Sequence, residues 1–281
     1  MKKMIRALFA LALAASMLMG FAIAETAEEI TVPSSIAHKN TAIVLDGDLT
    51  EWNLTDAIVL DKAEQLSRDD HMWAGVNDLS AKIYMAWDEN YLYIGAEITE
   101  NTPYGSIEML PLDGQDNIQL YLSTNPEDNF ARYAYSSTDF MVYLVMNNGY
   151  WDTAVDRSMV PKDNRLRYIS AGLDGMEDVL SDNAAKMGQT EGYKVGTKEC
   201  VTENGTGFIY EARIPWASFS NENIAQYCPA VGDTINFNVL ITDIDYPCPG
   251  TEYIPQMSWT GYDTEWLNNY PACWGMLTFA E

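Results

Sequence analysis

Positively charged residues are scarce in this chain of 281 residues, which has 16 lysines and arginines against 41 aspartates and glutamates. The resulting formal net charge is −25 at pH 7. Proteins that bind nucleic acids neutralise phosphates with basic side chains, so nucleic acid is excluded as an expected partner. The acidic field disfavours anionic membranes and polysaccharides and favours cations or neutral ligands, although it also serves to keep an exported protein soluble.

Long hydrophobic runs are absent after residue 24. The single run, residues 8–24, follows three basic residues and ends in the small-residue pattern Ala22-Ile23-Ala24. A cationic start, an apolar middle and small residues before the cleavage point are typical of a secretory signal peptide. We therefore expect cleavage after Ala24, removal of residues 1–24, and a mature chain that is secreted or held at the cell surface by partners, without membrane insertion.

Sequence motifs typical of catalytic sites are also absent. There is no Gly-x-Ser-x-Gly segment, and the only histidines, His38 and His71, have no evident nucleophile beside them. A glycoside hydrolase needs two carboxyl groups facing one sugar, and pairs such as Asp243 with Asp245 are common by chance among so many acidic residues. The sequence therefore favours a protein that is not an enzyme and leaves glycoside hydrolysis as the weaker alternative.

Cysteine is infrequent, and its four residues all lie in the last third of the mature chain, at Cys200, Cys228, Cys248 and Cys273. Because no two of them form a close Cys-x-x-Cys pair, zinc binding is the less favoured use of these residues. Export makes disulfides chemically accessible, so we expect two bridges near the C-terminal end of the fold. Four cysteines allow three pairings, and the sequence does not choose among them.

Helical periodicity is nearly absent, whereas short alternating apolar segments are frequent. Residues 83–87 and 91–98 alternate in this way and are separated by Asp88-Glu89-Asn90, which predicts a β-hairpin. Further strands, rich in β-branched or aromatic residues, are expected at Ile118–Leu122, Asp139–Met146, Gly207–Ile214 and Ile235–Ile241. Many short strands without intervening helices predict an all-β fold, an antiparallel two-sheet β-sandwich of the jelly-roll type.

The chain shows no repeat, low-complexity tract or internal domain boundary after the signal peptide. We expect residues 25–38 to form a linker or an edge strand and residues 39–281 to form one β-sandwich domain. A polar stretch at about residues 152–198 looks like a long, partly helical insertion, with its one helix at Asp178–Met187.

Aromatic residues are the distinctive side chains of the sequence, with 8 Trp, 17 Tyr and 8 Phe. Flat aromatic faces stack on the C–H patches of sugars while polar neighbours bind the hydroxyls, so rings outside the core indicate a sugar site. Trp87, Trp216 and Trp274 follow or interrupt apolar strand patterns and are expected in the core. Trp266 lies in a polar loop, residues 261–269, where it either binds a ligand or pins the loop onto the core.

A series of segments is distributed in order over most of the mature chain: Leu45–Trp52, Lys82–Ile94, Asp116–Leu122, Glu211–Trp216, Phe237-Asn238, Ser258-Trp259 and Trp274–Leu277. The hairpin Lys82–Ile94, with Trp87-Asp88-Glu89-Asn90-Tyr91 at its centre, is the most specific of them. In this order the segments resemble the family 9 carbohydrate-binding modules. The resemblance implies a jelly-roll-like sandwich, a site for a small sugar or a chain end framed by aromatic rings, structural calcium in several members, and no catalysis.

The resemblance also places a sugar site at particular positions. Trp266 matches the C-terminal stacking tryptophan of the family, and Asp263 stands where an asparagine binds sugar. Gln119 stands where a glutamate binds sugar, on the strand that begins at Asp116, and Asp116 is also expected among the ligand-binding residues. Arg132 corresponds to the arginine that the family has on the following strand.

One expected ring is missing from this set. The second tryptophan of the family's aromatic clamp should lie three residues before Asp116, where this chain has Asp113. Tyr104, Trp73 and Trp151 are the candidates to supply a ring from a neighbouring loop, and Tyr104 is the nearest along the chain. Without a second ring the site is a one-sided platform, and the lost stacking face costs about 1 kcal/mol of binding free energy.

Calcium is the cofactor that the resemblance implies, and no organic cofactor is expected. Among the many carboxylates, Asp243 and Asp245 together with Asp46 are the expected ligands. No loop of the sequence has the residue spacing of a dedicated calcium motif.

Three hypotheses for the function follow. The leading one is a non-catalytic, exported protein that holds a neutral mono- or oligosaccharide or a polysaccharide chain end, with a secreted enzyme of polysaccharide degradation or a cell-surface component as partner. The second is a haem or redox module on the same sandwich, with His38 or His71 and a methionine as axial ligands. The third is a cell-surface interaction domain that kept the fold and lost sugar binding.

Overall fold

Strands make up nearly all of the regular structure in the computed structural model of the chain, which describes residues 32–68, 72–103, 116–145, 166–172, 175–177, 194–220, 225–245 and 254–281. By their contacts, residues Val32–Glu281 form one unit. The expected signal peptide lies outside the described residues. None of the helices in the described part combines the length and the apolar character that a membrane span requires.

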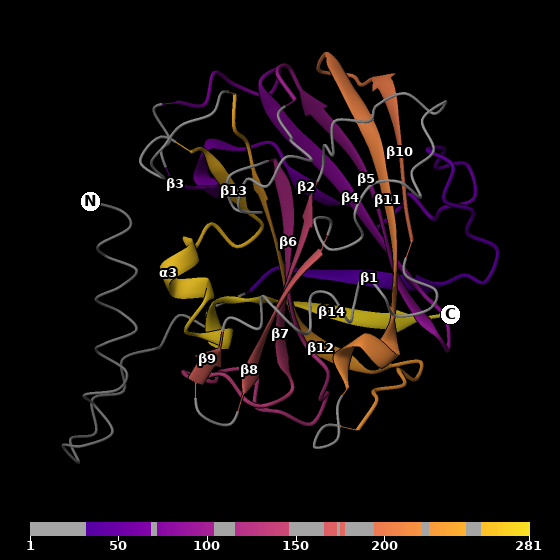
Figure 1. Ribbon diagram of the computed structural model, residues 1–281, viewed down its shortest axis with the longest axis vertical. Helices are drawn as coiled ribbons and strands as arrows, with labels where there is room; N and C mark the ends of the chain where they lie inside the picture. Colours follow the sequence, from indigo (N-terminus) through magenta and orange to yellow (C-terminus); the bar gives the residue numbers. More distant parts are fainter. Residues whose placement is uncertain are drawn as a thin grey trace, which may run out of the picture. The chain divides into compact units, whose positions relative to one another are not determined.

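The first layer of the fold contains four long strands in the order β10-β11-β5-β4, with a short strand on the outer side of β4. These strands are β2 (Ile58–Leu60), β4 (Leu79–Trp87), β5 (Tyr91–Glu100), β10 (Lys194–Val201) and β11 (Thr206–Pro215). All of their pairings are antiparallel, and Figure 1 shows β4, β5, β11 and β10 side by side. The predicted hairpin is confirmed as β4 and β5, because the Asp88 carboxylate accepts the N–H groups of Asn90 and Tyr91 and closes the turn.

The second layer has the order β14-β12-β6-β7-β8-β9. These strands are β6 (Asn117–Ser123), β7 (Asp139–Val145), β8 (Leu166–Gly172), β9 (Gly175–Glu177), β12 (Thr234–Thr242) and β14 (Gly275–Ala280). A short strand, β13 (Gln256–Ser258), pairs with β12 and with β3 (Leu66–Arg68). Two strands, β8 and β9, lie within the stretch expected as a partly helical insertion, and the helix expected at Asp178–Met187 lies outside the described residues.

The first strand, β1 (Ser34–Lys39), joins the two layers into one continuous mixed sheet. It pairs in parallel with β14 on one side and with β4 on the other. Of the residues 25–38 that were expected to form a linker or an edge strand, Ser34–His38 belong to β1; Ser34–Ile36 pair with β14 alone, whereas Ala37 and His38 pair with both β14 and β4. The all-β sandwich is confirmed, but its sheet is mixed rather than purely antiparallel.

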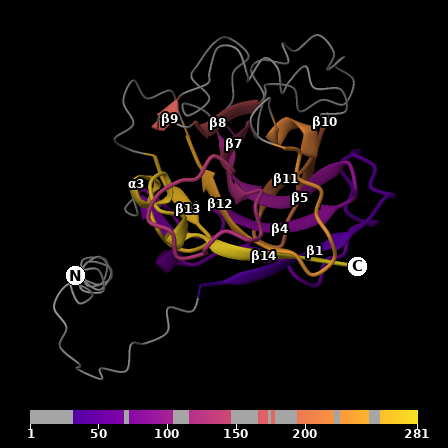
Figure 2. The ribbon, with the colours of Figure 1, turned by 90° about the horizontal axis from the view of Figure 1, so that it is seen from below.

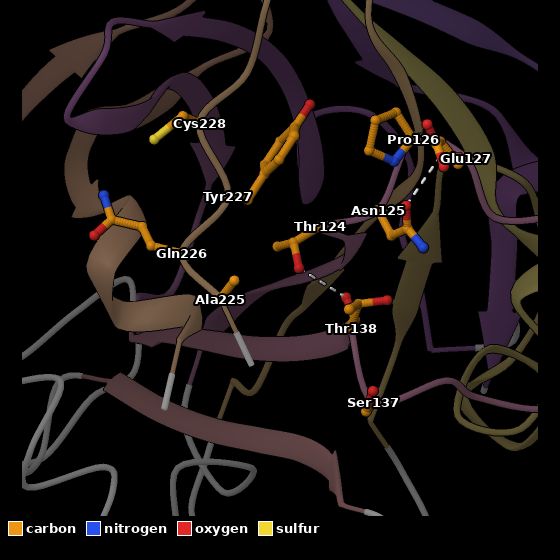
Figure 3. Close-up of a pocket in the computed structure, with 10 residues that line it drawn as sticks. All are labelled: Thr124, Asn125, Pro126, Glu127, Ser137, Thr138, Ala225, Gln226, Tyr227 and Cys228. Carbon is orange, nitrogen blue, oxygen red and sulfur yellow. Dashed lines mark hydrogen bonds between the residues drawn. The ribbon is translucent and has the colours of Figure 1, made fainter. Parts of the chain in front are cut away.

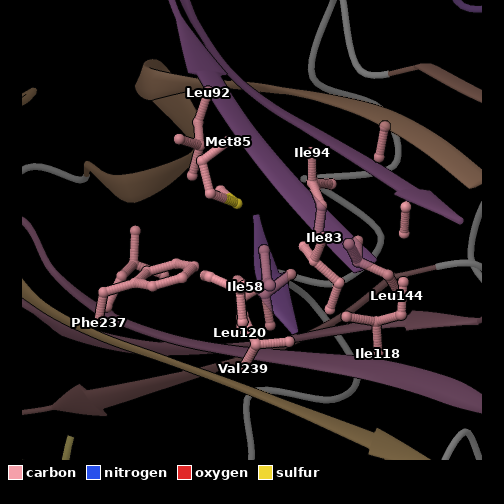
Figure 4. Packing of buried hydrophobic residues seen from close by; sticks show 14 of the residues in the cluster. Ile58, Ile83, Met85, Leu92, Ile94, Ile118, Leu120, Leu144, Phe237 and Val239 are labelled. Carbon is pink, nitrogen blue, oxygen red and sulfur yellow. The ribbon is translucent and has the colours of Figure 1, made fainter. Parts of the chain in front are cut away.

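The main core lies between the two layers, where alternate residues of each strand face inward. Ile83 and Ile94 from β4 and β5 face Ile118 and Leu120 from β6 and Val239 from β12, as Figure 4 shows. Trp87 and Trp216 are buried in this core, as predicted. Trp274 is also buried, but in a smaller cluster on the outer face of the second layer.

The described cysteines are free thiols at Cys200, Cys228 and Cys273, and Cys248 lies outside the described residues. If all four cysteines formed two disulfides, Cys248 would pair with one of these three, and the other two would have to pair with each other. The expected pair of disulfides is therefore not formed in this structure. The sites are far apart in the fold, because Cys200 lies on β10 of the first layer while Cys273 packs on the outer face of the second.

Candidate functional site

The outer face of β6 and β12 is the part of the fold to which the expected sugar ligands belong. Inward residues of β6, such as Leu120, pack in the main core, whereas the alternate residues Asn117, Gln119 and Tyr121 point outward. The C-terminal residues 259–274 cover part of this face, since Leu267 and Trp274 pack on Tyr121, Met141 and Leu240. The sheet therefore presents a floor, and the C-terminal segment forms a wall beside it.

The wall is built around a short helix, α3 (Thr264–Leu267), and Figure 2 shows it next to β12 and β13. Asp263 caps the helix, because its side chain accepts the N–H of Trp266 at 3.1 Å. The carbonyl of Leu267 accepts the Trp274 indole N–H at 3.0 Å and the Tyr135 hydroxyl at 2.8 Å. Helices this short are unstable alone, so these tertiary bonds fix the orientation of Trp266.

Four rings form a contiguous aromatic row along this wall, made up of Tyr262, Trp266, Tyr270 and Tyr133. The ring centroids of Trp266 and Tyr270 are 5.1 Å apart, those of Tyr262 and Trp266 are 6.4 Å apart, and those of Tyr133 and Tyr270 are 6.3 Å apart. Tyr133 is 52% exposed, and the other three are partly buried. Trp266 thus lies in a helix within a group of rings, and not alone in a loop as the sequence indicated.

The aromatic row could have been recognised in part from the sequence. Tyr262, Trp266 and Tyr270 are spaced four residues apart, which places side chains on the same side of a helical turn. Tyr133 had no such signal, because it comes from a different segment and reaches the row through tertiary contacts. The peptide N–H of Ala272 donates to the carbonyl of Arg132 at 2.9 Å and so holds this segment beside the C-terminal residues.

A second ring facing Trp266 is not supplied by Trp73. This side chain packs against the main core between the layers, and its indole N–H donates to the carbonyl of Leu79 at 2.9 Å. The other positions considered for a clamp, Tyr104, Asp113 and Trp151, lie outside the described residues.

Gln119 is buried at 1% exposure and is engaged with its neighbours. Its Nε2 donates to Asn117 Oδ1 at 3.0 Å and approaches Thr242 Oγ1 at 3.3 Å, while its Oε1 accepts the Tyr121 hydroxyl at 2.9 Å. The same hydroxyl lies 3.1 Å from Oδ1 of Asn268, which directly follows α3. Gln119 therefore positions Tyr121 and the wall, and it belongs to the floor of the site rather than its exposed surface.

Arg132 lies close to the aromatic row, but its guanidinium is bound to two carboxylates. It contacts Asp128 at 3.0 Å and Asp139 at 2.5 Å, and its side chain is 14% exposed. Burial raises the pKa of Asp139, which the neighbouring Arg132 opposes. In this structure Arg132 anchors the segment that carries Tyr133.

Asp116 does not join the aromatic row, because it belongs to a carboxylate cluster at the beginning of β6. The carboxylate cluster consists of Asp78, Glu100, Asp116, Asp243 and Asp245. One oxygen from each of Asp78, Asp243 and Asp245 lies within 4.8 Å of the other two, and the same holds for Glu100, Asp116 and Asp243. Asp243 is shared by both groups and is the centre of the cluster.

Most of the carboxylate cluster is withdrawn from water. Glu100 and Asp116 are fully buried and Asp243 is 1% exposed. Burial, followed by the charges of Asp116 and Asp243, raises the pKa of Glu100 to about 10. Burial, followed by the charges of Asp245 and Asp78, raises the pKa of Asp243 to about 7. The geometry therefore collects carboxylates that cannot all be charged without a compensating cation.

Two of the three expected calcium ligands, Asp243 and Asp245, lie together in the carboxylate cluster, but Asp46 lies elsewhere. The N–H groups of Asp46 and Gly47 donate to the Glu211 carboxylate on β11. Glu211 is paired with Gly95, five residues before Glu100 on β5, which corresponds to about 16 Å along the strand. Asp46 is therefore not a ligand of the carboxylate cluster.

The other residues that were considered for a functional site lie away from the aromatic row and from the carboxylate cluster. His38 Nε2 is 2.7 Å from the carboxylate of Asp56, and His71 lies outside the described residues. An open pocket of about 450 Å³ lies at the other end of β6, and Figure 3 shows its lining. None of the residues expected in a sugar or metal site lines this pocket, and the hydroxyl of its one ring, Tyr227, donates to Asp233 at 3.0 Å.

Known proteins resemble this chain in sequence and in structure, although no model of a protein family matches it. The exoglucanase XynX of Acetivibrio thermocellus is 25% identical over 220 residues, which cover 76% of this chain and 15% of that protein. This chain therefore spans only a small part of the length of that relative.

Solved structures give the more extensive match. A family 9 carbohydrate-binding module from Caldicellulosiruptor kristjanssonii in complex with cellotriose has a TM-score of 0.51 and 16% identity, over 88% of this chain and 94% of that chain. A family 9 module from the same organism in complex with glucose has a TM-score of 0.50 and 16% identity, over 88% of this chain and 95% of that chain. The chain therefore has the fold of the family 9 carbohydrate-binding modules.

Proposed function

We propose that this protein is a non-catalytic module that binds a neutral sugar or the end of a glycan chain at the aromatic row. The observation that carries the proposal is the group of rings centred on Trp266, of which Tyr133 is exposed and the other three are partly buried. A sugar stacks its C–H face on such rings while its hydroxyls bind polar groups at the edge.

The comparisons support carbohydrate as the class of ligand. The structural neighbours are carbohydrate-binding modules in complex with cellotriose and with glucose, and the relative in sequence is an exoglucanase. The net charge of −25 favours uncharged over anionic glycans. We further propose that the protein is exported and acts outside the cell, alongside enzymes that degrade polysaccharides.

The geometry supports a one-sided platform. The rings of the aromatic row are tilted by 43° to 65° relative to their neighbours, so they form a corrugated surface rather than two parallel walls. A ligand on one face only loses the contribution of a second stacking ring, about 1 kcal/mol. We therefore expect weaker binding of single sugars than a two-ring clamp would give.

Substitution of Trp266 by Ala tests the proposal directly. Isothermal titration calorimetry against glucose and soluble cello-oligosaccharides, chosen from a glycan array, should show binding by the wild-type chain and a loss of at least about five-fold in the Trp266→Ala variant. Tyr91→Ala is the matched control, because this partly buried ring lies on the outer face of the first layer under Arg213. It should bind sugars as the wild type does.

Three results would contradict the proposal. Absence of binding to every glycan on the array, with a folded wild-type protein, would favour the interaction domain that lost sugar binding. Release of reducing ends from any polysaccharide would show an enzyme instead. A redox module would reveal itself by visible absorbance in the purified protein.

A further inference from the structure

The pocket at the other end of β6 belongs neither to the aromatic row nor to the carboxylate cluster. It has a volume of about 450 Å³ and lies where the connection between β6 and β7, residues 124–138, meets residues 225–228, which precede β12. Figure 3 shows Pro126 on one side of the open space and Gln226 on the other. Pockets that hold small organic molecules have volumes of about 300–1,000 Å³, so this one is large enough for a ligand.

The side of the pocket formed by the β6–β7 connection is held in place by Asp128. Its carboxylate accepts the side-chain N–H of Asn125 at 2.8 Å and the hydroxyls of Ser136 at 3.0 Å and Thr138 at 3.2 Å. The guanidinium of Arg132 contacts the same carboxylate at 3.0 Å. One side chain therefore joins four positions of the connection and fixes the shape of this wall.

The opposite side of the pocket is fixed by Tyr227, which is buried. Its ring centroid lies 5.5 Å from that of Trp216 and 6.1 Å from that of Phe279, and its hydroxyl donates to Asp233 at 3.0 Å. The N–H of Ala230 donates to the same carboxylate at 3.0 Å. Both walls are thus preorganised, so a ligand does not have to order them when it binds.

Several polar groups of the lining are free to bind a ligand. Ser137 and Gln226 make no hydrogen bond or ion pair in the described part of the chain. Asn125 uses one of its two amide N–H groups on Asp128, and the hydroxyl of Thr124, which donates within the connection, retains its lone pairs. The pocket therefore offers both donors and acceptors of hydrogen bonds.

The chemistry of the lining restricts the class of ligand. None of the lining residues is a lysine, an arginine or a histidine, and Glu127 supplies a carboxylate, so phosphates and other anions lack the basic groups that bind them. The apolar part of the lining is small, since it consists of Pro126, Ala225 and the buried ring of Tyr227. A lipid or another apolar molecule is therefore also disfavoured.

We propose that this pocket is a second ligand site, which binds a neutral, hydroxylated small molecule such as a mono- or disaccharide. The hydroxyls of such a ligand donate and accept hydrogen bonds, which matches the free groups of Ser137 and Gln226. A neutral ligand also meets no repulsion from a chain with a formal net charge of −25. The site does not depend on sugar binding at the aromatic row, because the two consist of different residues.

A second site has a consequence for attachment to polysaccharides, and this consequence rests on the proposed function. The β6–β7 connection carries Tyr133 of the aromatic row as well as Asn125 and Ser137 of the pocket. If both sites bind sugar, one protein engages two glycan chains or two branches of one chain. The effective concentration of the second ligand then increases retention without any new contact at either site.

The experiment separates the pocket from the aromatic row by using the full chain with Trp266→Ala. Calorimetry with glucose, cellobiose and maltose should show remaining binding of at least one sugar by this variant. Adding Ala225→Trp, which fills the pocket, should weaken that binding by at least about ten-fold. Ala230→Trp in the same background is the matched control, because Ala230 is also exposed but lies outside the lining, and it should leave the binding unchanged.

The free thiol of Cys228 gives a second measurement, because this exposed side chain lines the pocket. Alkylation by iodoacetamide, followed by peptide mass spectrometry, should slow at Cys228 in proportion to the fraction of sites occupied by the sugar. Cys200 on β10 is the internal control and should react at an unchanged rate. Glucuronate, which matches glucose in size but is anionic, should protect Cys228 less than glucose does.

Thermal unfolding checks that the variants are folded. If Ala225→Trp does not fold, Gln226→Ala replaces it, and this exposed position should lose about five-fold in affinity through its hydrogen bonds. The proposal is overturned if Trp266→Ala binds none of the sugars and they do not protect Cys228, or if filling the pocket leaves the binding unchanged. Sugar binding by the wild type that Trp266→Ala abolishes would leave the aromatic row as the sugar site and refute the pocket alone.

Discussion

Glu211 shows how a single buried side chain fixes a distant loop. Its carboxylate accepts the N–H groups of Asp46 and Gly47 at 3.0 and 2.6 Å and the indole N–H of Trp52 at 2.9 Å. Gly47 has a φ of +79°, and a Cβ there would meet the side chain of Lys198. The segment that resembles the opening of the family 9 modules is therefore a structural anchor on the first layer.

Removal of this anchor should cost considerable stability. Glu211→Ala leaves three donors without their acceptor, and hydrogen bonds to charged groups contribute about 1.5–3 kcal/mol each, so we expect a loss of about 3 kcal/mol or more. Glu211→Gln retains one acceptor oxygen and should lose less. Urea unfolding measures both, with the exposed Glu64→Ala as a control that should change stability by less than about 0.5 kcal/mol. Equal stability of Glu211→Ala and wild type would refute this role.

Individual residues differ in how well the sequence predicted their roles. Trp87 and Trp216 were recognised as core because they interrupt apolar strand patterns. Arg132 and Gln119 were assigned to ligand binding by resemblance, but the structure engages them with Asp139 and with Tyr121. No local sequence pattern indicates these tertiary contacts. A structural role and a ligand-binding role could therefore not be distinguished for these residues before the fold was known.

The short helix α3 determines how the aromatic row is presented. Asp263 was expected to bind sugar, yet in the structure its side chain caps the helix that carries Trp266. The two roles can be separated, because Ser also caps helices well while its shorter side chain reaches less far. A capping role predicts that replacement by Ser is tolerated and replacement by Ala is not.

We therefore predict that Asp263→Ala lowers stability by about 1 kcal/mol and weakens sugar binding through disorder of α3. Asp263→Ser should retain most of both. Thermal unfolding and calorimetry with the same oligosaccharide measure the two effects in one set of samples. If both variants lose sugar binding equally while their stability is unchanged, Asp263 contacts the ligand directly.

Tyr133 extends the aromatic row beyond the C-terminal segment. Because it is 52% exposed and lies at the end of the row, its replacement by Ala should leave stability within about 0.5 kcal/mol of the wild type. We expect oligosaccharides to lose about five-fold in affinity, corresponding to about 1 kcal/mol, while single sugars bound at Trp266 are unaffected. Calorimetry with ligands of increasing length provides the measurement, and an equal loss for glucose would contradict this arrangement.

The positions of the strands along the chain were easier to predict than the pairing of the strands with one another. The strands β4, β5, β6, β11 and β12 follow local alternation and were expected within a few residues. The position of β1 between the two layers was not expected, because its parallel pairing with β14 joins residues from opposite ends of the domain. Likewise, α3 was missed because four residues with one polar cap give too little periodicity.

The whole molecule connects the two candidate sites through shared strands. Asp116 of the carboxylate cluster is followed on β6 by Asn117 and Gln119, and Asp243 is preceded on β12 by Thr242, to which Gln119 is directed. Gln119 in turn contacts Tyr121, whose hydroxyl lies beside the residue that ends α3. The calcium that the resemblance to the family 9 modules implies, if bound at the carboxylate cluster, would therefore fix the ends of β6 and β12 and with them the floor of the proposed sugar site.

This connection predicts that calcium strengthens sugar binding. Without the ion, repulsion among the buried carboxylates should loosen the paired ends of β6 and β12, and part of the sugar binding energy would be spent on restoring them. Calorimetry of the wild type in calcium and in chelator, at equal ionic strength, should show tighter sugar binding with calcium. Because the two binding equilibria are thermodynamically linked, the sugar should raise the affinity for calcium by the same factor by which calcium raises the affinity for the sugar.

Asp243→Asn is the decisive variant for this connection. It leaves the aromatic row intact, so it should bind sugar, but with an affinity that no longer responds to calcium. Trp266→Ala should show the reverse, with normal calcium binding and weak sugar binding. If sugar affinity in the wild type is the same in calcium and in chelator, the aromatic row and the carboxylate cluster are independent of each other, and the contacts of Gln119 with Asn117, Thr242 and Tyr121 do not couple them.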